Sequence, residues 1–392
     1  MNVVIAAAVR TPVGAFQGAF SPLKASELGA AAIREAVSRA RLERDAVDLV
    51  LMGNVLSAGM GQAPARQAAI YADLDQKTPA VTLNKMCGSG LEAIIQAARA
   101  VALGDAEVVV AGGMESMTNA PYLLPGARGG LRMGDKPLID SMVHDGLWDV
   151  YNDKHMGSCA ELCAQRYDLT RETQDDFAST SYRRAQEATQ NGSLEREIVP
   201  VEVKGRKGDV TTVREDEGPA QVKFDKIPQL RPAFEREGTV TAANASTIND
   251  GAAALTITSE ETARARGMDV LARLSGYAAH AREPELFTLA PVGAMQKLFD
   301  RLNWQPDSVD LYEINEAFAV VPLAAMNEFS LPHDRVNVHG GAVAVGHPIG
   351  ASGARIVVTL LNALKQRGKT RGMASICIGG GEALALGLEL AN

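Results

Sequence analysis

Two cysteines and one histidine, each flanked by glycines, are the residues of this chain best suited to covalent chemistry. Cys87 lies in residues 84–90, Cys377 begins residues 377–381, and His347 lies in residues 346–350. Glycine has no Cβ, so the backbone can reverse there and a ligand can approach closely. Two thiols and one imidazole in such segments indicate acyl transfer through a cysteine thioester.

Cys87 directly precedes an expected helix whose first turn is rich in glycine. Its sulfur would face unpaired N–H groups and the positive end of the helix dipole, a setting that favours the thiolate. The thiolate is the nucleophilic form of cysteine and a good leaving group from a thioester. The motif alone is equally compatible with a buried cysteine in a tight turn.

Three further groups are candidates for the same chemistry. His347, held by Pro348 and by flanking glycines, is suited to be a general base, although a lone histidine there could be structural. Cys377 precedes residues 379–381, whose N–H groups could bind an oxyanion, but it could also be a core cysteine. Asn315 follows an apolar strand and could orient a water, donate to a carbonyl or cap a helix.

A degenerate duplication would position these residues. Apolar helices are expected over residues 91–103, after Cys87, and over residues 351–364, after His347. Each leads into a buried strand that ends in glycines, over residues 107–113 and 373–380. Strand, apolar helix and strand form the βαβ pattern, so we expect an α/β fold of two duplicated halves. The two helices should pack against each other at the centre.

The segment between the halves differs, with frequent glycines and charges and few strand signals. We expect an inserted loop domain over residues 121–245, with amphipathic helices over residues 157–167 and 174–189. The N-terminal half then covers residues 1–120, completed by about 246–268, and the C-terminal half covers 269–392. Cys159 and Cys163 are interpreted as core cysteines, because no further ligand stands at metal-binding spacing.

Composition excludes several functional classes. The 392 residues are 46% hydrophobic and 22% charged, as in a globular protein, and no apolar run is long enough to cross a bilayer. A net charge of −8 argues against a general nucleic-acid partner. The opening residues resemble neither a signal peptide nor a transit segment, and four cysteines form no disulfide framework. These features predict a cytoplasmic protein with reduced thiols.

Together, nine segments resemble the thiolase family, in order and over essentially the whole chain. They are residues 10–16, 53–56, 61–67, 84–90, 112–117, 244–251, 315–318, 346–353 and 377–381. The resemblance implies duplicated βαβ halves with mixed five-stranded sheets, central buried helices and an inserted loop domain.

By this resemblance Cys87 is the acylated nucleophile and His347 is its activating base. His347 and a water held by Asn315 stabilise the enolate, and Cys377 is the second acid/base. The N–H groups of Cys87 and Gly379 form the oxyanion hole. The implied reaction joins two acetyl-CoA into acetoacetyl-CoA and CoA, or cleaves a 3-ketoacyl-CoA in reverse, and it requires neither a cofactor nor a metal.

The resemblance also implies an acyl-CoA site. Its residues would be Leu147, His155, Met156, Phe234, Ala242, Ser246, Phe287, Ala317 and Phe318. Residues 134–146 and His155 look like the acetoacetyl-CoA branch, which favours short substrates. Phe287 stands where that branch usually has methionine, and Thr247 stands where glycine is common. Residues 216–229 also depart from the family pattern, where Pro219 and Ala220 replace basic or polar residues that grip CoA.

Acyl-CoA thioesters and further copies of this chain are the expected partners. The resemblance implies a dimer paired through the N-terminal halves, and residues 123–133 lie where related chains carry a tetramerising loop, so we expect a tetramer. Three alternatives remain: a thiolase of broader chain length, a ketoacyl synthase, and a non-catalytic acyl-CoA or lipid-binding protein. Cys377 argues against the synthase, which uses histidine or asparagine there. The three intact reactive residues argue against the binding protein.

Overall fold

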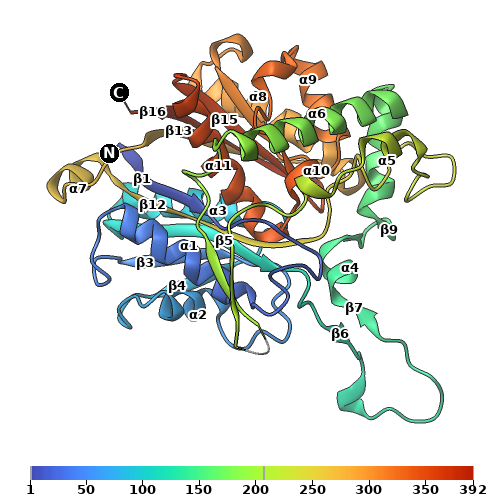
Figure 1. Ribbon diagram of the computed structural model, residues 1–392, viewed down its shortest axis with the longest axis horizontal. Coiled ribbons are helices and arrows are strands. Elements are labelled where there is room, and N and C mark those ends of the chain that lie inside the picture. The colour runs from blue at the N-terminus through green and yellow to red at the C-terminus, as the bar shows by residue number, and fades with distance from the viewer. Residues whose placement is uncertain (1, 206–207, 392) are drawn as a thin grey trace.

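The computed structural model describes residues 2–205 and 208–391, and its centre is one hydrogen-bonded mixed sheet (Figure 1). Strands of the N-terminal half lie in the order β4 (Ala80–Leu83), β3 (Leu49–Gly53), β5 (Val108–Ser116), β12 (Asn249–Ser259) and β1 (Val3–Arg10). The strand β3 runs parallel to β4 and β5, whereas β12 runs antiparallel to β5 and β1. The short strand β2 (Gly14–Ala15) pairs with β12.

The C-terminal half continues the same sheet. Its strands lie in the order β13 (Ala272–Ala281), β16 (Glu382–Leu390), β15 (Arg371–Ile378) and β14 (Leu311–Ile314). The expectation of two five-stranded sheets is therefore corrected. Within the described residues, the C-terminal set has four strands and an isolated Tyr312–Val336 bridge, and Val4 and Ile5 of β1 pair with β13, which joins the two sets.

Two apolar helices pack against each other at the centre, as the sequence predicts. They are α3 (Ser89–Leu103) and α11 (Ile349–Gln366), and each begins two residues before its expected start. Their backbones approach so closely that a Cβ on Gly90 would lie 2.7 Å from the Ala354 nitrogen. A Cβ on Gly353 would likewise lie 2.5 Å from the nitrogen of Leu91. The glycines that follow Cys87 and His347 thus permit the helix contact that places both residues together.

Further helices cover the sheet from outside. In the N-terminal half α1 (Ala25–Arg39) packs on β12 and β5, and α2 (Pro64–Tyr71) packs on α1. In the C-terminal half α8 (Ala290–Leu302) packs on β13 and β16, and α9 (Val320–Phe329) contacts α8. The short helices α7 (Glu260–Ala265) and α10 (Ala342–Val345) complete these halves. In the described part of the chain, no helix is both long and apolar enough to cross a membrane.

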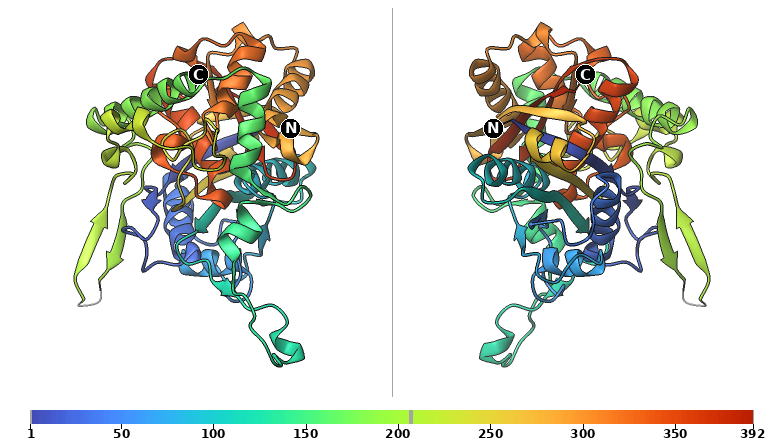
Figure 2. Two further views of the ribbon diagram at one scale, coloured as in Figure 1. Left: turned by 90° about the vertical axis from the view of Figure 1, so that its right-hand side faces the viewer. Right: turned by 90° about the vertical axis from the view of Figure 1, so that its left-hand side faces the viewer.

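The segment between the halves carries small hairpins and two longer helices. Its helices are α4 (Ser141–Gly146), α5 (Met156–Arg166) and α6 (Arg171–Gln190), so the two helix predictions are confirmed with shifted ends. Its strand pairs are β6 (Tyr122–Leu123) with β7 (Ile139–Asp140), β8 (Trp148–Asp149) with β9 (Lys154–His155), and β10 (Val201–Lys204) with β11 (Val210–Val213). The loop between β6 and β7 extends away from the body, and the hairpin of β10 and β11 stands off one side (Figures 1 and 2). Cys159 and Cys163 lie buried in the apolar core, as expected.

Candidate active site

One cavity of about 220 Å³ brings together most of the residues singled out in the sequence. It lies where α3, α11 and the turn after β15 meet the inserted segment. Eleven of the expected residues line it: Cys87, Leu147, His155, Met156, Phe234, Ser246, Phe287, Ala317, Phe318, His347 and Gly379. The lining also contains Met117, Gly146, Ala245, Thr247, Ile248 and Ile349. Of these, Thr247 was named individually from the sequence, and the other five lie in segments that were named there.

Three expected residues lie outside this lining. Asn315 and Cys377 are fully buried. Cys377 lies near enough to Cys87 for a charge on one sulfur to raise the pKa of the other thiol. Ala242 is exposed and is not part of the cavity wall, whereas Ala245 is. The binding role of Ala242 therefore stays a prediction.

Cys87 occupies a tight turn before α3, and only 8% of its surface is exposed. Met86 precedes it with a left-handed φ of 46°. Burial raises the pKa of the Cys87 thiol to about 11, although the backbone N–H groups of Gly379 and Cys87 lower it. Burial therefore opposes the resting thiolate expected from the sequence, because loss of water outweighs both N–H groups.

His347 has one ring nitrogen engaged and one free. Its Nδ1 lies 2.6 Å from the Ser352 Oγ, and that hydroxyl donates to the Pro348 carbonyl over 2.9 Å. Since Ser352 has a single proton to donate, the network assigns the His347 proton to Nδ1. The Nε2 is buried without a partner among the described residues, and burial lowers the pKa of His347 to about 3. Nε2 is therefore a neutral base with a free lone pair.

Asn315 follows β14 and presents a free amide N–H group. Its backbone nitrogen donates to Ser375 over 2.9 Å, and its Oδ1 accepts from Arg355 Nη2 over 3.3 Å. The Nδ2 is buried and has no partner within the described residues. Such a group is suited to hold a water or a substrate oxygen.

The turn after β15 supplies the second N–H group beside Cys87. Gly380 and Gly381 have φ values of 94° and 90°, in the left-handed region that glycine tolerates. A Cβ on Gly381 would also lie 2.3 Å from the Arg282 carbonyl oxygen. The glycines thus permit the turn that aims the Gly379 N–H at the Cys87 sulfur. Two N–H groups at one sulfur can bind the oxyanion formed when a thioester carbonyl is attacked there.

Aromatic rings build the opposite wall of the cavity. His155 stacks on Phe234 with ring centroids 4.8 Å apart, and its Nδ1 accepts from the Gly157 N–H over 3.0 Å. Phe318 meets Phe234 edge-on at 6.0 Å and Phe287 at 6.4 Å. Phe287 is only 2% exposed. The rings leave an apolar space suited to a small acyl group.

Four polar residues form one stripe on the second apolar helix, and two of them contact site residues. Ser352 contacts His347, and Arg355 contacts Asn315. Thr359 and Asn362 bind the buried Glu197 over 3.1 and 2.9 Å. The polar stripe on an otherwise apolar helix was therefore a signal in the sequence that these four side chains have buried polar partners.

Glu115 was missed altogether, although its segment was singled out. Its carboxylate accepts from the backbone N–H groups of Val55, Leu56 and Gly350, and from Asn54. Burial raises the pKa of Glu115 to about 7. The residue ties the first turn of α11 to β5, which fixes His347 relative to the sheet.

Comparisons with known proteins agree with this geometry. Models of the N-terminal and C-terminal thiolase domains match residues 3–261 and 268–390. The chain is 50% identical to an acetyl-CoA acetyltransferase of Cupriavidus necator, with 99% of each chain covered. A crystal structure of the Bacillus anthracis acetyl-CoA acetyltransferase superposes with a TM-score of 0.97 at 40% identity, covering 100% of this chain and 99% of that one. A thiolase of Ascaris suum in complex with coenzyme A superposes with a TM-score of 0.94 at 44% identity, covering 100% of both chains. The chain belongs to the thiolase family.

Proposed function

We propose that this protein is an acetyl-CoA acetyltransferase, which condenses two acetyl-CoA into acetoacetyl-CoA and CoA and catalyses the reverse cleavage. The observation that carries the proposal is the meeting of Cys87, His347 and the Gly379 N–H in one small cavity, with Cys377 behind it. Relatives named acetyl-CoA acetyltransferase, similar over 99% of the chain, support it.

In the first half-reaction the Cys87 sulfur attacks the carbonyl carbon of acetyl-CoA while Nε2 of His347 takes the thiol proton. The N–H groups of Cys87 and Gly379 stabilise the oxyanion. The C–S bond to CoA then breaks, and Cys377 donates its proton to the departing CoA sulfur. Acetyl-Cys87, a Cys377 thiolate and a protonated His347 remain, so the protons balance.

In the second half-reaction the Cys377 thiolate removes an α-proton from a second acetyl-CoA. The protonated His347 and a water on Asn315 Nδ2 stabilise the enolate oxygen. The enolate carbon attacks the acetyl carbonyl, and Cys87 leaves as a thiolate that recovers its proton from His347. Acetoacetyl-CoA is released, and both cysteines return to the thiol form.

The resting protonation states suit this sequence of steps. A neutral thiol and a neutral imidazole avoid the cost of burying two charges in a dry cavity. Burial places the pKa of Cys87 at about 11 and that of His347 at about 3, so proton transfer is coupled to attack on the thioester. Cys377 also rests as a neutral thiol, because burial raises its pKa.

We further propose a preference for short acyl groups. The cavity holds about 220 Å³, and Phe287 and Phe318 close its apolar wall. Two relatives similar over most of the chain are named probable acetyl-CoA acyltransferases, which keeps a broader chain length as the second candidate. The expected CoA contacts, Ala242 among them, belong to the same proposal. Pro219, in the segment that departs from the family pattern, is buried, and its carbonyl oxygen accepts from Gln186 Nε2 over 2.8 Å.

We also propose a homotetramer built as a dimer of dimers. The extended loop between β6 and β7 exposes Leu131, Met133 and Leu138, and Met133 is 99% exposed. Strand β4 ends the sheet with Val81 exposed, so one edge is unpaired in the single chain. Light scattering at micromolar concentration should give four chains. A monomer would contradict the whole assembly, and a dimer would contradict the pairing of two dimers.

Two further predictions from the sequence stay predictions. They are the division into residues 1–120, 121–245 and 269–392 and a cytoplasmic location.

Mass spectrometry of the acyl-enzyme tests the proposed function. After mixing with acetyl-CoA, a peptide that contains Cys87 should gain one acetyl group and lose it when CoA is added. The matched control is Cys159→Ser, since Cys159 lies in the core of α5 outside the cavity lining. Persistent absence of the adduct would favour the non-catalytic binding protein.

A further inference from the structure

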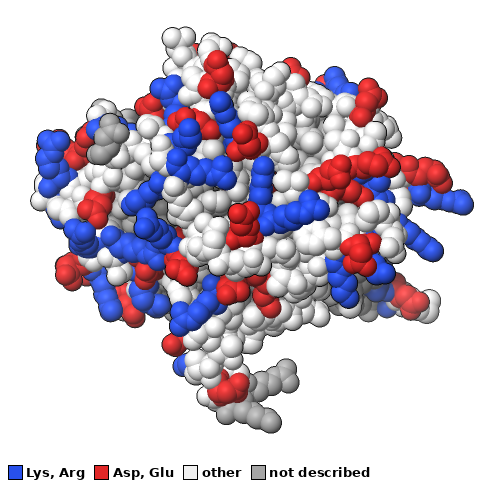
Figure 3. Space-filling view, turned by 45° about the horizontal axis from the view of Figure 1, so that its top comes forward, with Lys and Arg blue, Asp and Glu red and all other residues white. Residues whose placement is uncertain are grey.

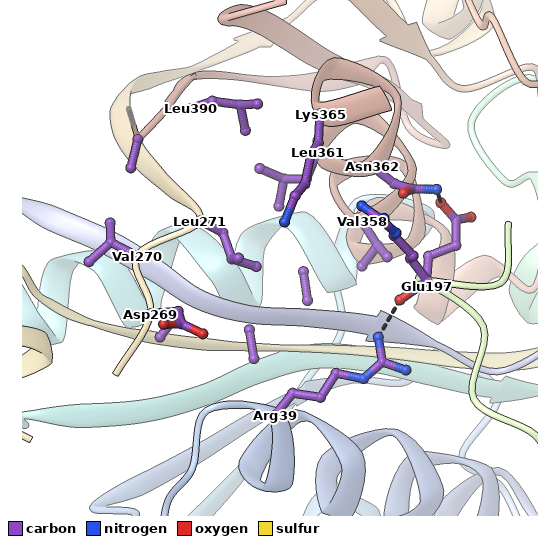
Figure 4. Close-up of a pocket in the computed structure, with 15 residues that line it drawn as sticks. Arg39, Glu197, Asp269, Val270, Leu271, Val358, Leu361, Asn362, Lys365 and Leu390 are labelled. Carbon is purple, nitrogen blue, oxygen red and sulfur yellow. Dashed lines mark hydrogen bonds between the residues drawn. The ribbon is translucent and has the colours of Figure 1, made fainter. Parts of the chain in front are cut away.

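A second and larger cavity lies away from the catalytic one, at the junction of the two halves. It holds about 760 Å³ and is formed by β1, the residues that lead into β13, the end of β16 and the last turns of α11. None of its lining residues lines the catalytic cavity. Figure 4 shows the side chain of Lys365 reaching into this space from α11 above it. We name it the junction cavity.

The walls of the junction cavity are largely apolar. Leu271, Val358, Leu361 and Leu390 surround the space in Figure 4. Ala6, Ala7 and Ala8 of β1 also line it. Leu271 and Leu390 are partly exposed, so the cavity opens to solvent along an apolar edge. A hydrocarbon chain placed there would remove this surface from water.

The acidic residues of the junction cavity are already engaged. Glu197 accepts from Arg10 Nε over 2.6 Å, and Asp269 pairs with Arg41 over 3.0 Å. The Arg39 guanidinium is likewise paired, with Glu35 over 2.7 Å. Arg196 and Lys365 are exposed, and neither forms an ion pair within the described residues. The exposed charged groups of the junction cavity that have no ion-pair partner within the described residues are therefore both cations, Arg196 and Lys365.

A second space of about 640 Å³ adjoins the junction cavity and shares Arg196 and Lys365 with it. We name it the basic groove. Its wall adds Arg184 and Arg367, against the single carboxylate of Glu187. The basic groove lies at the ends of α6 and α11, and both spaces share the end of α11. Figure 3 shows one face of the molecule, on which Lys and Arg side chains are numerous in the left half. This concentration of cations contrasts with the net charge of −8 of the chain.

His339 gives independent support for a ligand in the basic groove. The side chain lines the groove but is only 7% exposed. Its Nδ1 is buried and has no hydrogen-bond partner among the described residues. Buried polar atoms are ordinarily paired, so this imidazole, placed among cations, points to a missing polar partner.

We propose that the junction cavity and the basic groove together bind an amphipathic anion. Its acyl chain lies in the junction cavity, against Leu361 and Leu390. Its carboxylate or phosphate head lies between Arg196 and Lys365 and faces Arg367 and His339 in the basic groove. Apolar walls beside cations without an ion-pair partner match this chemistry better than a neutral lipid, because the basic groove offers charge for an anionic head. They also match it better than a nucleotide, because the apolar side chains of the junction cavity would leave much of a polar base and sugar without partners.

Calorimetric titration of the full-length protein tests the proposal. The probes are laurate and dodecyl phosphate, both below their micellar concentrations. Each probe should bind in one equivalent per chain. The double variant R196E/K365E should weaken binding by about tenfold or more, since two charge-assisted contacts are lost. The matched control Lys369→Glu, an exposed lysine at the same end of α11 and outside both spaces, should leave affinity within about twofold.

Further experiments distinguish binding of the ligand's acyl chain from binding of its anionic head. Leu390→Gln should weaken both probes but leave the binding of inorganic phosphate unchanged. Tighter binding of dodecyl phosphate than of laurate would identify a phosphorylated lipid as the preferred class, and the reverse order would identify a fatty acid. Acetyl transfer by these variants should match that of the parent, which separates this site from the catalytic one. No binding of either probe up to millimolar concentration, or equal affinity in the charge-reversed variant, would overturn the proposal.

Discussion

Arg355 donates from Nη2 to the Oδ1 of Asn315 over 3.3 Å, inside a core where both side chains are buried. Because the amide oxygen is engaged, the amide nitrogen must face the other way, and this Nδ2 has no partner within the described residues. Arg355 also lies 3.8 Å from Glu313, whose pKa burial raises to about 8. The guanidinium thus fixes which end of the Asn315 amide faces the water proposed at the active site.

We therefore predict that Arg355→Lys slows condensation while acylation of Cys87 survives. Lysine keeps the charge but lacks the planar fork that orients the amide. We expect kcat for condensation to fall by between about tenfold and a hundredfold, with a small change in KM. Burst measurements of acetyl-enzyme formation, compared with steady-state rates, separate the two steps.

The control for this variant is Thr359→Val on the same helix, because Thr359 contacts Glu197 rather than Asn315. It should keep the parent ratio of the two rates. Equal losses of acylation and condensation in Arg355→Lys would show that the arginine stabilises the core without orienting Asn315.

Cys87→Ser should nearly abolish turnover. A serine hydroxyl has a far higher pKa than a thiol, and its alkoxide is a poor leaving group in the second step. Steady-state rates of acetoacetyl-CoA cleavage and mass spectra after acetyl-CoA treatment check this outcome. Full activity in this variant would remove Cys87 from the role of nucleophile.

Cys377→Ser should still become acetylated at Cys87, although more slowly, because CoA can leave as a thiolate without a proton donor, but it should lose the Claisen step. The side chain is fully buried next to Cys87, where it is suited to proton transfer. General acid/base catalysis contributes about two to four orders of magnitude, so condensation should fall by about that factor. If acetylation is lost and condensation survives, the two cysteines have the opposite roles.

The reactivity of Cys87 toward iodoacetamide should rise with pH beyond pH 9. Burial holds the pKa of the thiol at about 11, so the thiolate fraction increases tenfold per pH unit below that value. His347, whose pKa burial lowers to about 3, stays neutral over the same range and contributes no cation that would stabilise a thiolate. Stopped-flow alkylation between pH 6 and pH 10, with Cys87→Ser as the blank, measures the profile. A plateau below pH 8 would show that a thiolate forms in the resting enzyme.

The sequence singled out most of the residues that line the small cavity, because glycines in their local context are visible in the chain itself. Glycines beside Cys87, His347 and Cys377 signalled close backbone approach, and the close contact of Gly90 with Ala354 confirms it. The resting charge of Cys87 was not predictable in this way. It depends on burial by side chains remote in the sequence, which the helix-dipole argument does not include.

The joining of the two halves into one continuous sheet also could not be predicted from local sequence patterns. The continuity of the two halves rests on the pairing of Val4 with Arg273 and of Ile5 with Ala272, a long-range register that no turn signal encodes. Likewise the partner of Glu115 is the first turn of a helix from the other half of the chain. Such contacts follow from tertiary packing, and a single sequence without relatives offers no signal for them.

Phe287 should limit the length of the acyl chain. Its ring lies in the wall of the catalytic cavity, 6.4 Å from the ring of Phe318 and only 2% exposed. A ring at this position is stiffer than a thioether and cannot fold aside, and overpacked apolar sites accept extra methylenes poorly. Phe287→Met and Phe287→Ala should therefore raise the cleavage of longer 3-ketoacyl-CoAs relative to acetoacetyl-CoA. Rates over a series of chain lengths measure this, with Phe299→Leu, on α8 and outside the cavity, as the control for lost aromatic packing. An unchanged profile in both Phe287 variants would show that another part of the cavity wall sets chain length.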